Sequence, residues 1–408
     1  MLSESKKIYM DNGATTPVFP EAIEAMADCM RNAFGNPSSI HYFGRLAYEK
    51  MDTARAQVAA LIGAPKEDIL FTSGGTEADN MVLLGIAERH PGGHIITSSI
   101  EHPAVFDTCK HLAKQGYDIT YLPVDEYGMV DPDSVKAALR PDTCLVSVMH
   151  ANNEVGTIQP IKEIGHIVNE AGIPFHVDAV QSVGKIEVDV NELGCDLLTC
   201  SSHKINGPKG AGALYIRRGT KINRHVYGGG QERKMRSGTE NVPGIVGFGV
   251  AAQITAQNWR EKAEYNRKLA KYLTEGILSQ IDDSFLNGHP VNRLPHNVNV
   301  SFSYIEGEAL LLYLDMKGIA VSSGSACSSG SLSPSHVLTA MGLPKERLHS
   351  AIRMTLGMGN TMEDMDYVIN VFKEKVAVLR AASPFLLKSS CMRLHISSAD
   401  KLMAAFIF

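Results

Sequence analysis

A lysine that directly follows an apolar run is the residue whose setting most suggests chemistry. Lys204 stands in TCSSHKINGPKGAG (199–212), where an apolar run ends and glycines and a proline follow at once. A partly desolvated lysine at the end of a strand has a lowered pKa and can act as a nucleophilic amine. Taken alone, however, a lysine in such a place is more often a surface residue of a loop.

Three further motifs follow other apolar runs. Asp178, in HVDAVQ, could pair with a pyridinium nitrogen, as pyridoxal phosphate chemistry requires, although alone it is more often a capping or turn residue. His102, in SIEHPAV, could stack on a flat ring or cap a helix. Gly74, Gly75 and Thr76, in TSGGTEADN, offer backbone N–H groups for a phosphate at a predicted helix N-terminus. A plain strand-to-helix turn also uses such glycines.

Together these motifs predict the parts of a pyridoxal phosphate site: a covalent lysine, a partner for the ring nitrogen, a stacking ring and a phosphate cradle. Each motif follows a different predicted strand, and the carboxyl ends of parallel strands meet at one edge of a sheet. The sequence contains neither a nucleotide-binding glycine fingerprint nor a cluster with metal-ligand spacing, so we expect no metal site.

The elements that must position these residues are strands alternating with helices. From Asp68 onward the predicted strands are DILFTS, HIITSS, DITYLPV, CLVSVMH, IPFHVDA, DLLTCSS and GALYIRR. Such apolar runs, spaced by helices, predict a mostly parallel sheet covered on both faces. Helical periodicity covers about 20–31 and 43–62, and a long helix is expected from Val242 past Leu273. The expected fold class is α/β, with a seven-stranded type of sheet in a large domain and a smaller α+β domain.

Length and charge limit the kind of protein. The chain has 408 residues, of which 44% are hydrophobic and 20% charged, and this length is too great for one ordinary core. We expect an N-terminal arm over 1–18 that packs with the small domain, a large cofactor-binding domain over 19–260 and a small domain over 261–408. A net charge of −5 without a long basic run argues against nucleic acid as a partner.

Export and membrane signals are not seen in the sequence pattern. The first ten residues, MLSESKKIYM, lack the apolar region of a signal peptide. No apolar stretch has the length of a membrane span. Seven scattered cysteines fit a reducing compartment better than a disulfide scaffold. We therefore expect a cytoplasmic protein without a membrane partner.

The ordered motifs resemble those of the cysteine desulfurases of the NifS/IscS type, which belong to class V of the fold-type I pyridoxal phosphate enzymes. The resemblance extends from YMDNGATTPV to about Ala382. It rests on NPSSIH, TSGGTEADN, HANNEVGTIQP, HVDAVQ, SSHKINGPKGAGALY, RSGTENV and SSGSACSSG. It implies a homodimer that uses pyridoxal 5'-phosphate to convert L-cysteine to L-alanine, with the sulfur transferred as a persulfide to a cysteine of the enzyme.

The resemblance implies roles for the reacting residues. Lys204 matches the lysine that binds the cofactor covalently, His102 the ring that stacks on it and moves protons, and Cys327 the cysteine that accepts sulfur. Asn153 and Arg353 match the groups that bind the substrate carboxylate. A guanidinium is a natural bidentate partner for a carboxylate, whereas without the other motifs Arg353 would be taken for a surface residue of a strand.

The resemblance also implies ligands for the cofactor. Asp178 matches the partner of the ring nitrogen, and Gln181 matches the partner of the phenolic oxygen. Thr239, in RSGTENV, matches a residue that reaches the phosphate from the second subunit. The other implied phosphate ligands are Gly75, Thr76, Ser201 and His203.

Cys327 lies in SSGSACSSG (322–330), a stretch of small residues that alone would suggest a linker with a stray thiol. Under the resemblance the stretch is a carrier arm that brings the thiol to the cofactor and then to an acceptor. The implied acceptor is an iron–sulfur scaffold protein or another sulfur acceptor. General iron–sulfur cluster assembly, a nitrogenase-dedicated route and tRNA thiolation all stay open as the pathway served. The tail LLKSSCMRLHISSADKLMAAFIF departs from the family pattern, so the family's mode of scaffold docking is not implied, and Cys391 has no assigned role.

Two other functions stay open at this point. Another class V enzyme would share the cofactor site; selenocysteine lyase is the nearest, and a plain aminotransferase would not need Cys327. A non-catalytic sulfur-transfer or scaffold subunit would keep the fold without the cofactor chemistry. Loss of Lys204 or Asp178 would mark such a subunit, and the sequence contains both residues.

Overall fold

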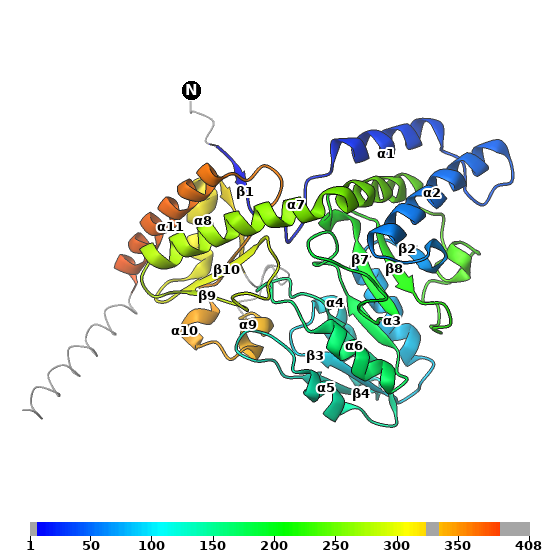
Figure 1. Ribbon diagram of the computed structural model, residues 1–408, viewed down its shortest axis with the longest axis horizontal. Helices are drawn as coiled ribbons and strands as arrows, with labels where there is room; N and C mark the ends of the chain where they lie inside the picture. Colours follow the sequence, from blue (N-terminus) through cyan, green and yellow to red (C-terminus); the bar gives the residue numbers. More distant parts are fainter. Residues whose placement is uncertain (1–5, 324–333, 384–408) are drawn as a thin grey trace, which may run out of the picture.

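The computed structural model describes residues 6–323 and 334–383 of the chain. Its largest sheet has seven strands in the order β2-β8-β7-β6-β5-β3-β4 (Figure 1). The strands are β2 (Ile69–Thr72), β3 (His94–Ser98), β4 (Asp118–Leu122), β5 (Thr143–Met149), β6 (Phe175–Asp178), β7 (Leu197–Ser201) and β8 (Gly212–Ile216). Only the two pairings of β8 are antiparallel. The expected mostly parallel sheet, with all seven of its strands, is confirmed.

Helices cover both faces of this sheet, as its apolar sequence requires. On β2, Ile69 and Phe71 belong to the core beneath α2 (Tyr42–Leu61), whereas Leu70 belongs to the core beneath α3 (Gly75–Ala87). This alternation follows from the two-residue period of a strand. The other covering helices are α1 (Pro20–Asn32), α4 (Pro103–Lys114), α5 (Pro132–Ala138) and α6 (Ile161–Glu170).

A second, antiparallel sheet of four strands lies toward the C-terminal end of the chain, in the order β12-β13-β10-β9. Its buried face includes Val298, Val300 and Met354, which pack in one core with the helices around it. The elements are β9 (Ser284–Leu286), β10 (Asn297–Phe302), α8 (Gly307–Met316), β12 (Ser322–Ser323), α9 (His336–Ala340), α10 (Lys345–Leu348), β13 (Ile352–Thr355) and α11 (Met362–Ala382).

One long helix joins the two sheets. α7 (Val242–Gln280) has 39 residues and runs from the side of α1 and α2 to the side of α8 and α11 (Figure 1). Its first half contributes to the core of the seven-stranded sheet and its second half to the core of the four-stranded sheet. α7 passes through the expected domain boundary at 260/261 without a break. The helix belongs to both cores, so the boundary stays a prediction.

The N-terminal arm connects the sheets a second time. β1 (Ile8–Tyr9) pairs in parallel with β11 (Ile319–Ala320), and Asp11 forms an isolated bridge with Thr355 of β13. A few residues later the arm reaches the other sheet, where the Thr16 N–H donates to the His203 carbonyl over 3.0 Å. The segment between these two attachments therefore crosses the carboxyl ends of β6 and β7, where the expected site residues lie.

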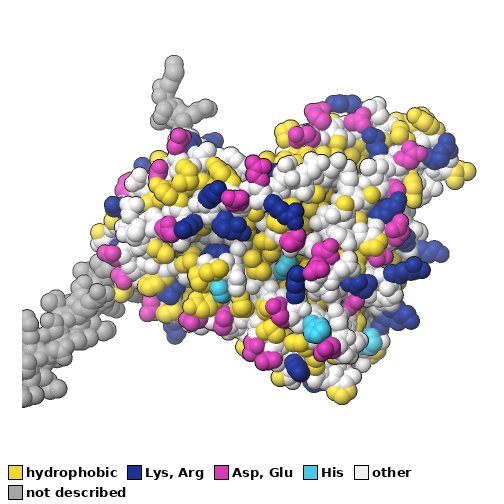
Figure 2. Space-filling view, viewed as in Figure 1, with side chains coloured by type: hydrophobic (Ala, Val, Ile, Leu, Met, Phe, Trp, Pro, Cys, Tyr) yellow, Lys and Arg dark blue, Asp and Glu magenta, His cyan; other side chains and the backbone are white. Residues whose placement is uncertain are grey.

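The surface seen in Figure 2 mixes charged and apolar side chains. Lys and Arg side chains are interspersed with Asp and Glu, and hydrophobic side chains are scattered over the viewed face, including the α1–α2 end. Phe34, Ile40 and Tyr42, in and beside the loop between these helices, are all more than half exposed. Within the described ranges, we find no helix that is both long and apolar enough to span a bilayer.

Candidate active site

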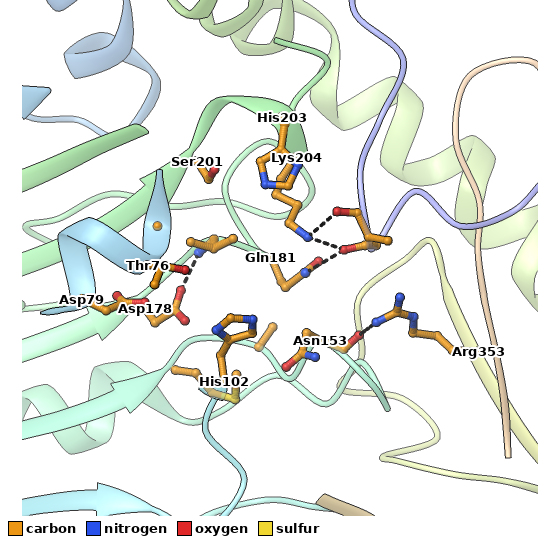
Figure 3. A pocket seen from close by; sticks show the side chains of 16 residues that line it. Thr76, Asp79, His102, Asn153, Asp178, Gln181, Ser201, His203, Lys204 and Arg353 are labelled. Atoms are coloured by element: carbon orange, nitrogen blue, oxygen red, sulfur yellow. Dashed lines mark hydrogen bonds between the residues drawn. The ribbon is translucent and has the colours of Figure 1, made fainter. Parts of the chain in front are cut away.

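A cavity of about 280 Å³ opens where the carboxyl ends of the parallel strands face the N-terminal arm and β13 (Figure 3). Ten of the expected residues line it: Gly75, Thr76, His102, Asn153, Asp178, Gln181, Ser201, His203, Lys204 and Arg353. Two expected residues are not among its lining. Thr239 is exposed and does not line the cavity, and Cys327 lies outside the described residues.

Lys204 is held by the N-terminal arm. It ends a single turn (Ser202–Lys204) that directly follows β7, so its side chain leaves the carboxyl edge of the sheet. Its Nζ donates to the carbonyl oxygens of Gly13 and Ala14 over 2.5 and 2.9 Å. The arm thus aims the amine into the cavity from a side that the strand pattern did not predict.

Asp178 is the last residue of β6, and the residue is 5% exposed. Its Oδ1 accepts from the Val180 N–H over 2.9 Å, which is the turn geometry expected from the alternative interpretation of this residue. Burial raises the pKa of Asp178 to about 6, against the opposing effects of the Val180 N–H and the Lys204 charge. A cationic N–H in the cavity would favour the ionised carboxylate further.

A second carboxyl group, that of Asp79, lies beside Asp178 in the same cavity wall (Figure 3). Burial first, and then the charge of Asp178, raise the pKa of Asp79 well above its usual range. Asp79 Oδ1 is also 3.6 Å from Nε2 of His176, another fully buried residue. Because like charges this close disfavour each other, the neutral member of the carboxyl pair is Asp79, and Asp178 is the one that ionises.

His102 combines the two roles that its sequence position allowed. As the N-cap of α4 it accepts the Ala104 N–H on Nδ1 over 3.1 Å, and its ring lines the cavity. Burial, then the charges of Lys204 and His336, lower the pKa of His102 to about 4. The ring is therefore neutral near pH 7, and because Nδ1 accepts, its hydrogen is on Nε2. A neutral ring in this position can stack on a flat cofactor.

The other end of the cavity suits an anion. α3 begins at Gly75, and the first backbone N–H groups of a helix have no partner within it. Ser201 Oγ is buried without a hydrogen-bond partner among the described residues. His203, next along the chain, has its pKa lowered to about 4, chiefly by burial, so it is neutral near pH 7. Gly75, Ser201 and His203 line the cavity together with Thr76, so several hydrogen-bond donors are available to an anion bound there.

These residues fit pyridoxal 5'-phosphate. The unpartnered Ser201 hydroxyl and the start of α3 suit its phosphate, a buried carboxylate at Asp178 suits its ring nitrogen, and Lys204 offers the amine that binds its aldehyde. Gln181, whose Nε2 donates to the Gly13 carbonyl over 3.1 Å, lies in the same wall. In the described ranges, no group of three or more His, Cys, Asp or Glu side chains could hold a metal ion.

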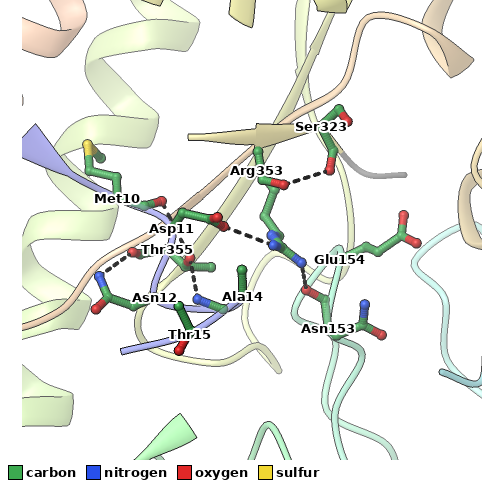
Figure 4. A network of polar contacts seen from close by, with 12 residues as sticks. Met10, Asp11, Asn12, Ala14, Thr15, Asn153, Glu154, Ser323, Arg353 and Thr355 are labelled. Atoms are coloured by element: carbon green, nitrogen blue, oxygen red, sulfur yellow. Dashed lines mark hydrogen bonds and ion pairs between the residues drawn. The ribbon is translucent and has the colours of Figure 1, made fainter. Parts of the chain in front are cut away.

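Arg353 enters the cavity from β13 of the second sheet, and its side chain is buried (Figure 4). Its Nη1 donates to the Asn153 carbonyl over 2.9 Å, and its Nη2 is 3.0 Å from Asp11 Oδ1. Nε is buried and has no partner within the described chain. The surface position that the strand alone suggested is therefore wrong, and beyond its contacts with Asn153 and Asp11 the guanidinium still has Nε–H as a donor for a ligand.

The residues that sequence reasoning missed belong mostly to the arm. Asp11, Gly13 and Ala14 fix Arg353 and Lys204, yet each contact spans roughly 190 to 340 residues of sequence. The block YMDNGATTPV marked the arm as distinctive without indicating where it would pack. Asp79 follows Gly75 at helical spacing, which indicated only that it belongs to the first turns of α3. The sequence did not indicate that its side chain lines the cavity.

Comparison with known proteins agrees with this geometry. Residues 8–368 match the family described as Aminotransferase class-V. The chain is 55% identical over 384 residues to "Cysteine desulfurase IscS" of Methanosarcina thermophila, covering 94% of this chain and 95% of that protein. It is 51% identical over 382 residues to "Cysteine desulfurase IscS" of Dictyoglomus turgidum, covering 93% and 97%.

Solved structures show the same fold. One described as "NIFS-LIKE PROTEIN" superposes with a TM-score of 0.87 at 39% identity, covering 92% of this chain and all of that chain. Another, "SspA in complex with cysteine", has a TM-score of 0.78 at 37% identity, covering 86% and 99%. The chain therefore belongs to the class-V aminotransferase family, with the fold of the fold-type I enzymes and pyridoxal 5'-phosphate as its cofactor.

Proposed function

We propose that the protein is a cysteine desulfurase, which converts L-cysteine to L-alanine and transfers the sulfur to Cys327 as a persulfide. One observation carries the proposal: a lysine, a buried carboxylate, a neutral histidine and an arginine with an unpartnered donor share a single cavity. The names of the relatives support the reaction, and a related structure in complex with cysteine supports the substrate.

Substrate binding is assigned to Arg353 and Asn153. The ion pair with Asp11 and the hydrogen bond to the Asn153 carbonyl fix the guanidinium plane before any ligand arrives. Nε then donates to the substrate carboxylate, which replaces the missing partner of a buried polar group. This contact orients the amino acid with its Cα toward Lys204, which enters the cavity from a different wall than Arg353 (Figure 3).

The cofactor, when bound, supplies an electron sink that makes the Cα proton of the substrate acidic. Asp178 supports this by pairing as a carboxylate with the ring nitrogen, and Gln181 donates to the phenolic oxygen. Lys204 is the group that moves the Cα proton, because its amine lies in the cavity while His102 presents an N–H rather than a lone pair on Nε2. His102 would stack on the cofactor ring, and its Nε2–H would be its hydrogen-bond donor. The phosphate is bound by Gly75, Thr76, Ser201 and His203.

Sulfur transfer is assigned to Cys327. Its thiolate attacks the substrate sulfur, the S–S bond forms and the C–S bond breaks, and the electron pair of that bond stays with Cβ, which takes a proton. L-cysteine and the enzyme thiol thereby give L-alanine and an enzyme persulfide, with atoms balanced. Persulfides pass their outer sulfur to another thiol.

The described ends of the segment that carries Cys327 support this assignment. On one side Ser322 of β12 pairs with Arg353 of β13. On the other side, Ser335 Oγ donates to Glu154 Oε2 over 2.5 Å, and His336 Nε2 is 2.9 Å from the Glu101 carbonyl. One end of this segment therefore lies beside Arg353. The other end lies beside Glu101 and Glu154, which are next in sequence to His102 and Asn153, so both ends are close to residues that line the cavity.

We infer that the working unit is a homodimer in the cytoplasm. The exposed apolar side chains of Phe34, Ile40 and Tyr42 form a surface that a second copy could cover. Thr239 is exposed outside its own cavity, which agrees with a ligand given to the phosphate of the other subunit. The described cysteines, Cys29, Cys109, Cys144, Cys195 and Cys200, carry no disulfide, as in a reducing compartment.

The proposed acceptor of the sulfur is an iron–sulfur scaffold protein, with tRNA thiolation as a further destination. The name IscS of the relatives supports a role in iron–sulfur cluster assembly. A thiol acceptor of this kind must reach the persulfide on Cys327 rather than the cofactor. Access to Cys327 therefore decides which acceptor receives the sulfur.

The proposal is tested by incubating the purified holoenzyme with L-cysteine and a thiol reductant and measuring alanine and sulfide together. We expect the two products in equal amounts. Alanine that forms without sulfide, and only when a keto acid such as pyruvate is added, would instead indicate an aminotransferase. Neither product, with the cofactor bound, would contradict the assignment.

Replacing Arg353 with lysine is expected to raise the KM for L-cysteine about tenfold or more, because an ammonium cannot reproduce the planar guanidinium contacts. The visible spectrum of the cofactor should not change. Steady-state kinetics measure the effect, and Arg347→Lys, which alters a half-buried arginine away from the cavity, is the matched control. An unchanged KM in Arg353→Lys would remove Arg353 from the substrate site.

A further inference from the structure

A second cavity of about 280 Å³ lies against the middle of α7, where this helix passes from one sheet to the other. Its walls come from both halves of the molecule: the arm at Asn12 and Thr16, the loop after β6 at Lys185, and the approach to β10 at His296. No residue lines both this cavity and the active-site cavity. It is therefore a separate space that the proposed reaction does not use.

Lys185 places a positive charge in this cavity. The preceding Gly184 has φ of +72°, and a Cβ there would lie 2.5 Å from Thr255 Cγ2 of α7, so a glycine lets this loop approach the helix. Within the described chain, no carboxylate and no hydrogen-bond acceptor is paired with the Lys185 amine. Burial, then the charges of Lys262 and Lys204, lower the pKa of Lys185 to about 8, so the amine is still mostly charged near pH 7.

The other charged or titratable groups of the cavity also lack a counter-ion in it. Lys262 of α7 lines it as a second cation. The Lys262 Nζ is 4.6 Å from the centroid of the Phe19 ring just outside the lining, where Glu21 and Glu261 also act on its charge. His296 is 1% exposed, and its Nδ1 has no hydrogen-bond partner in the part of the chain that the structure describes. Among the described residues that line the cavity there is neither an aspartate nor a glutamate. A partly buried lysine without a counter-ion and a buried imidazole nitrogen without a hydrogen-bond partner both cost free energy unless a ligand pairs with them.

We propose that this cavity binds a phosphate group, either as free phosphate or as part of a small metabolite, between Lys185 and Lys262. Two cations on different elements and the His296 ring offer donors from separate directions, as a tetrahedral dianion requires. The anion supplies the negative charge that the residues lining the cavity lack. The volume leaves room for a few further atoms attached to the phosphate.

The site is distinct from the place assigned to the phosphate of the cofactor. That phosphate lies at the start of α3 with Ser201, whereas the Lys185 cavity is on the other side of the arm segment 12–16. Gly13 and Ala14 of this segment hold the Lys204 amine through their carbonyls. The ligand therefore rests against the back of the wall that positions Lys204.

Thermal unfolding of the holoenzyme, with the cofactor bound, tests the proposal. Inorganic phosphate is titrated against sodium chloride of equal ionic strength, and glycerol phosphate is titrated in parallel as a phosphate monoester. A ligand that binds only the folded state raises Tm in proportion to its occupancy. We expect phosphate to raise the Tm of the wild type more than chloride does. Tighter apparent binding of the ester would assign the site to a metabolite, and tighter binding of phosphate to the free ion.

Lys185→Met and Lys262→Met are the test variants. Each should weaken phosphate binding about tenfold or more, because a hydrogen-bonded charge is lost. Lys185→Met should also raise Tm in phosphate-free buffer, since it removes a partly buried charge that has no counter-ion. Lys271→Met, on the exposed face of α7, is the matched control and should bind phosphate as the wild type does.

The proposal is overturned if chloride matches phosphate in the wild type, or if Lys185→Met keeps the wild-type phosphate response. It is also overturned if Lys271→Met loses as much binding as the two test variants. None of these outcomes depends on the desulfurase reaction, because binding rather than turnover is measured.

Discussion

Replacing Lys204 with alanine is expected to abolish turnover of L-cysteine and to change the visible spectrum of the purified protein. In the proposed mechanism this amine holds the cofactor covalently and moves the Cα proton, and loss of a proton-transfer group alone costs about 10² to 10⁴ in rate. The cofactor should then be held only by its noncovalent ligands, so the absorbance of the lysine adduct disappears. Absorbance of the dialysed protein and alanine release measure the two effects.

Two lysine variants make this result specific. Lys204→Arg keeps a cation beside the Gly13 and Ala14 carbonyls but cannot form the covalent bond, so it should behave as Lys204→Ala does. Lys209→Ala removes an exposed lysine five residues along the same loop and should leave both the spectrum and the rate unchanged. A wild-type spectrum in Lys204→Ala would show that another residue binds the cofactor.

Replacing Cys327 with alanine is expected to leave the cofactor spectrum intact and to stop sulfide release. The reason lies in the other cysteines. Burial raises the pKa of Cys109, Cys195 and Cys200 to about 12, and that of Cys144 to about 11, so near pH 7 these thiols are protonated and poorly nucleophilic. Cys29 is also fully buried, with its thiol pKa raised by burial.

The matched control is Cys391→Ala, because Cys391 is the one other cysteine without a described buried position. We expect it to release sulfide at the wild-type rate. The assay is run with limiting reductant, so that the reductant itself does not take sulfur from the substrate. Sulfide release by Cys327→Ala at the wild-type rate, or its loss in Cys391→Ala, would move the sulfur-accepting role away from Cys327.

Much of the fold follows from local sequence patterns. The seven strands of the large sheet were predicted because each is a short apolar run between turn residues, and α7 because its pattern extends over many helical turns. The short helices α9 and α10, of five and four residues, are too brief for a period to be measured. α6 was not predicted, although Ile161, Ile164 and Val168 are apolar residues at helical spacing, all of them buried.

The site was predictable wherever a polar residue ends a strand or follows one within a few residues. Asp178 ends β6, Lys204 follows the last residue of β7 and His102 follows the last residue of β3, and the structure brings them to one cavity with Arg353. The contacts of Asp11 and Gly13 were not predictable, because they depend on where the arm packs against both sheets rather than on any local pattern. The pKa shifts were unpredictable for the same reason: burial sets them, and burial arises from tertiary packing.

The most direct measurement is the mass of the Cys327 peptide after a single turnover with L-cysteine and no reductant. The account predicts that this peptide gains one sulfur atom, that one L-alanine is formed for each sulfur gained, and that a later addition of reductant restores the original mass while releasing sulfide. Alanine formed without any gain at Cys327, or a sulfur atom found on another cysteine peptide instead, would contradict it.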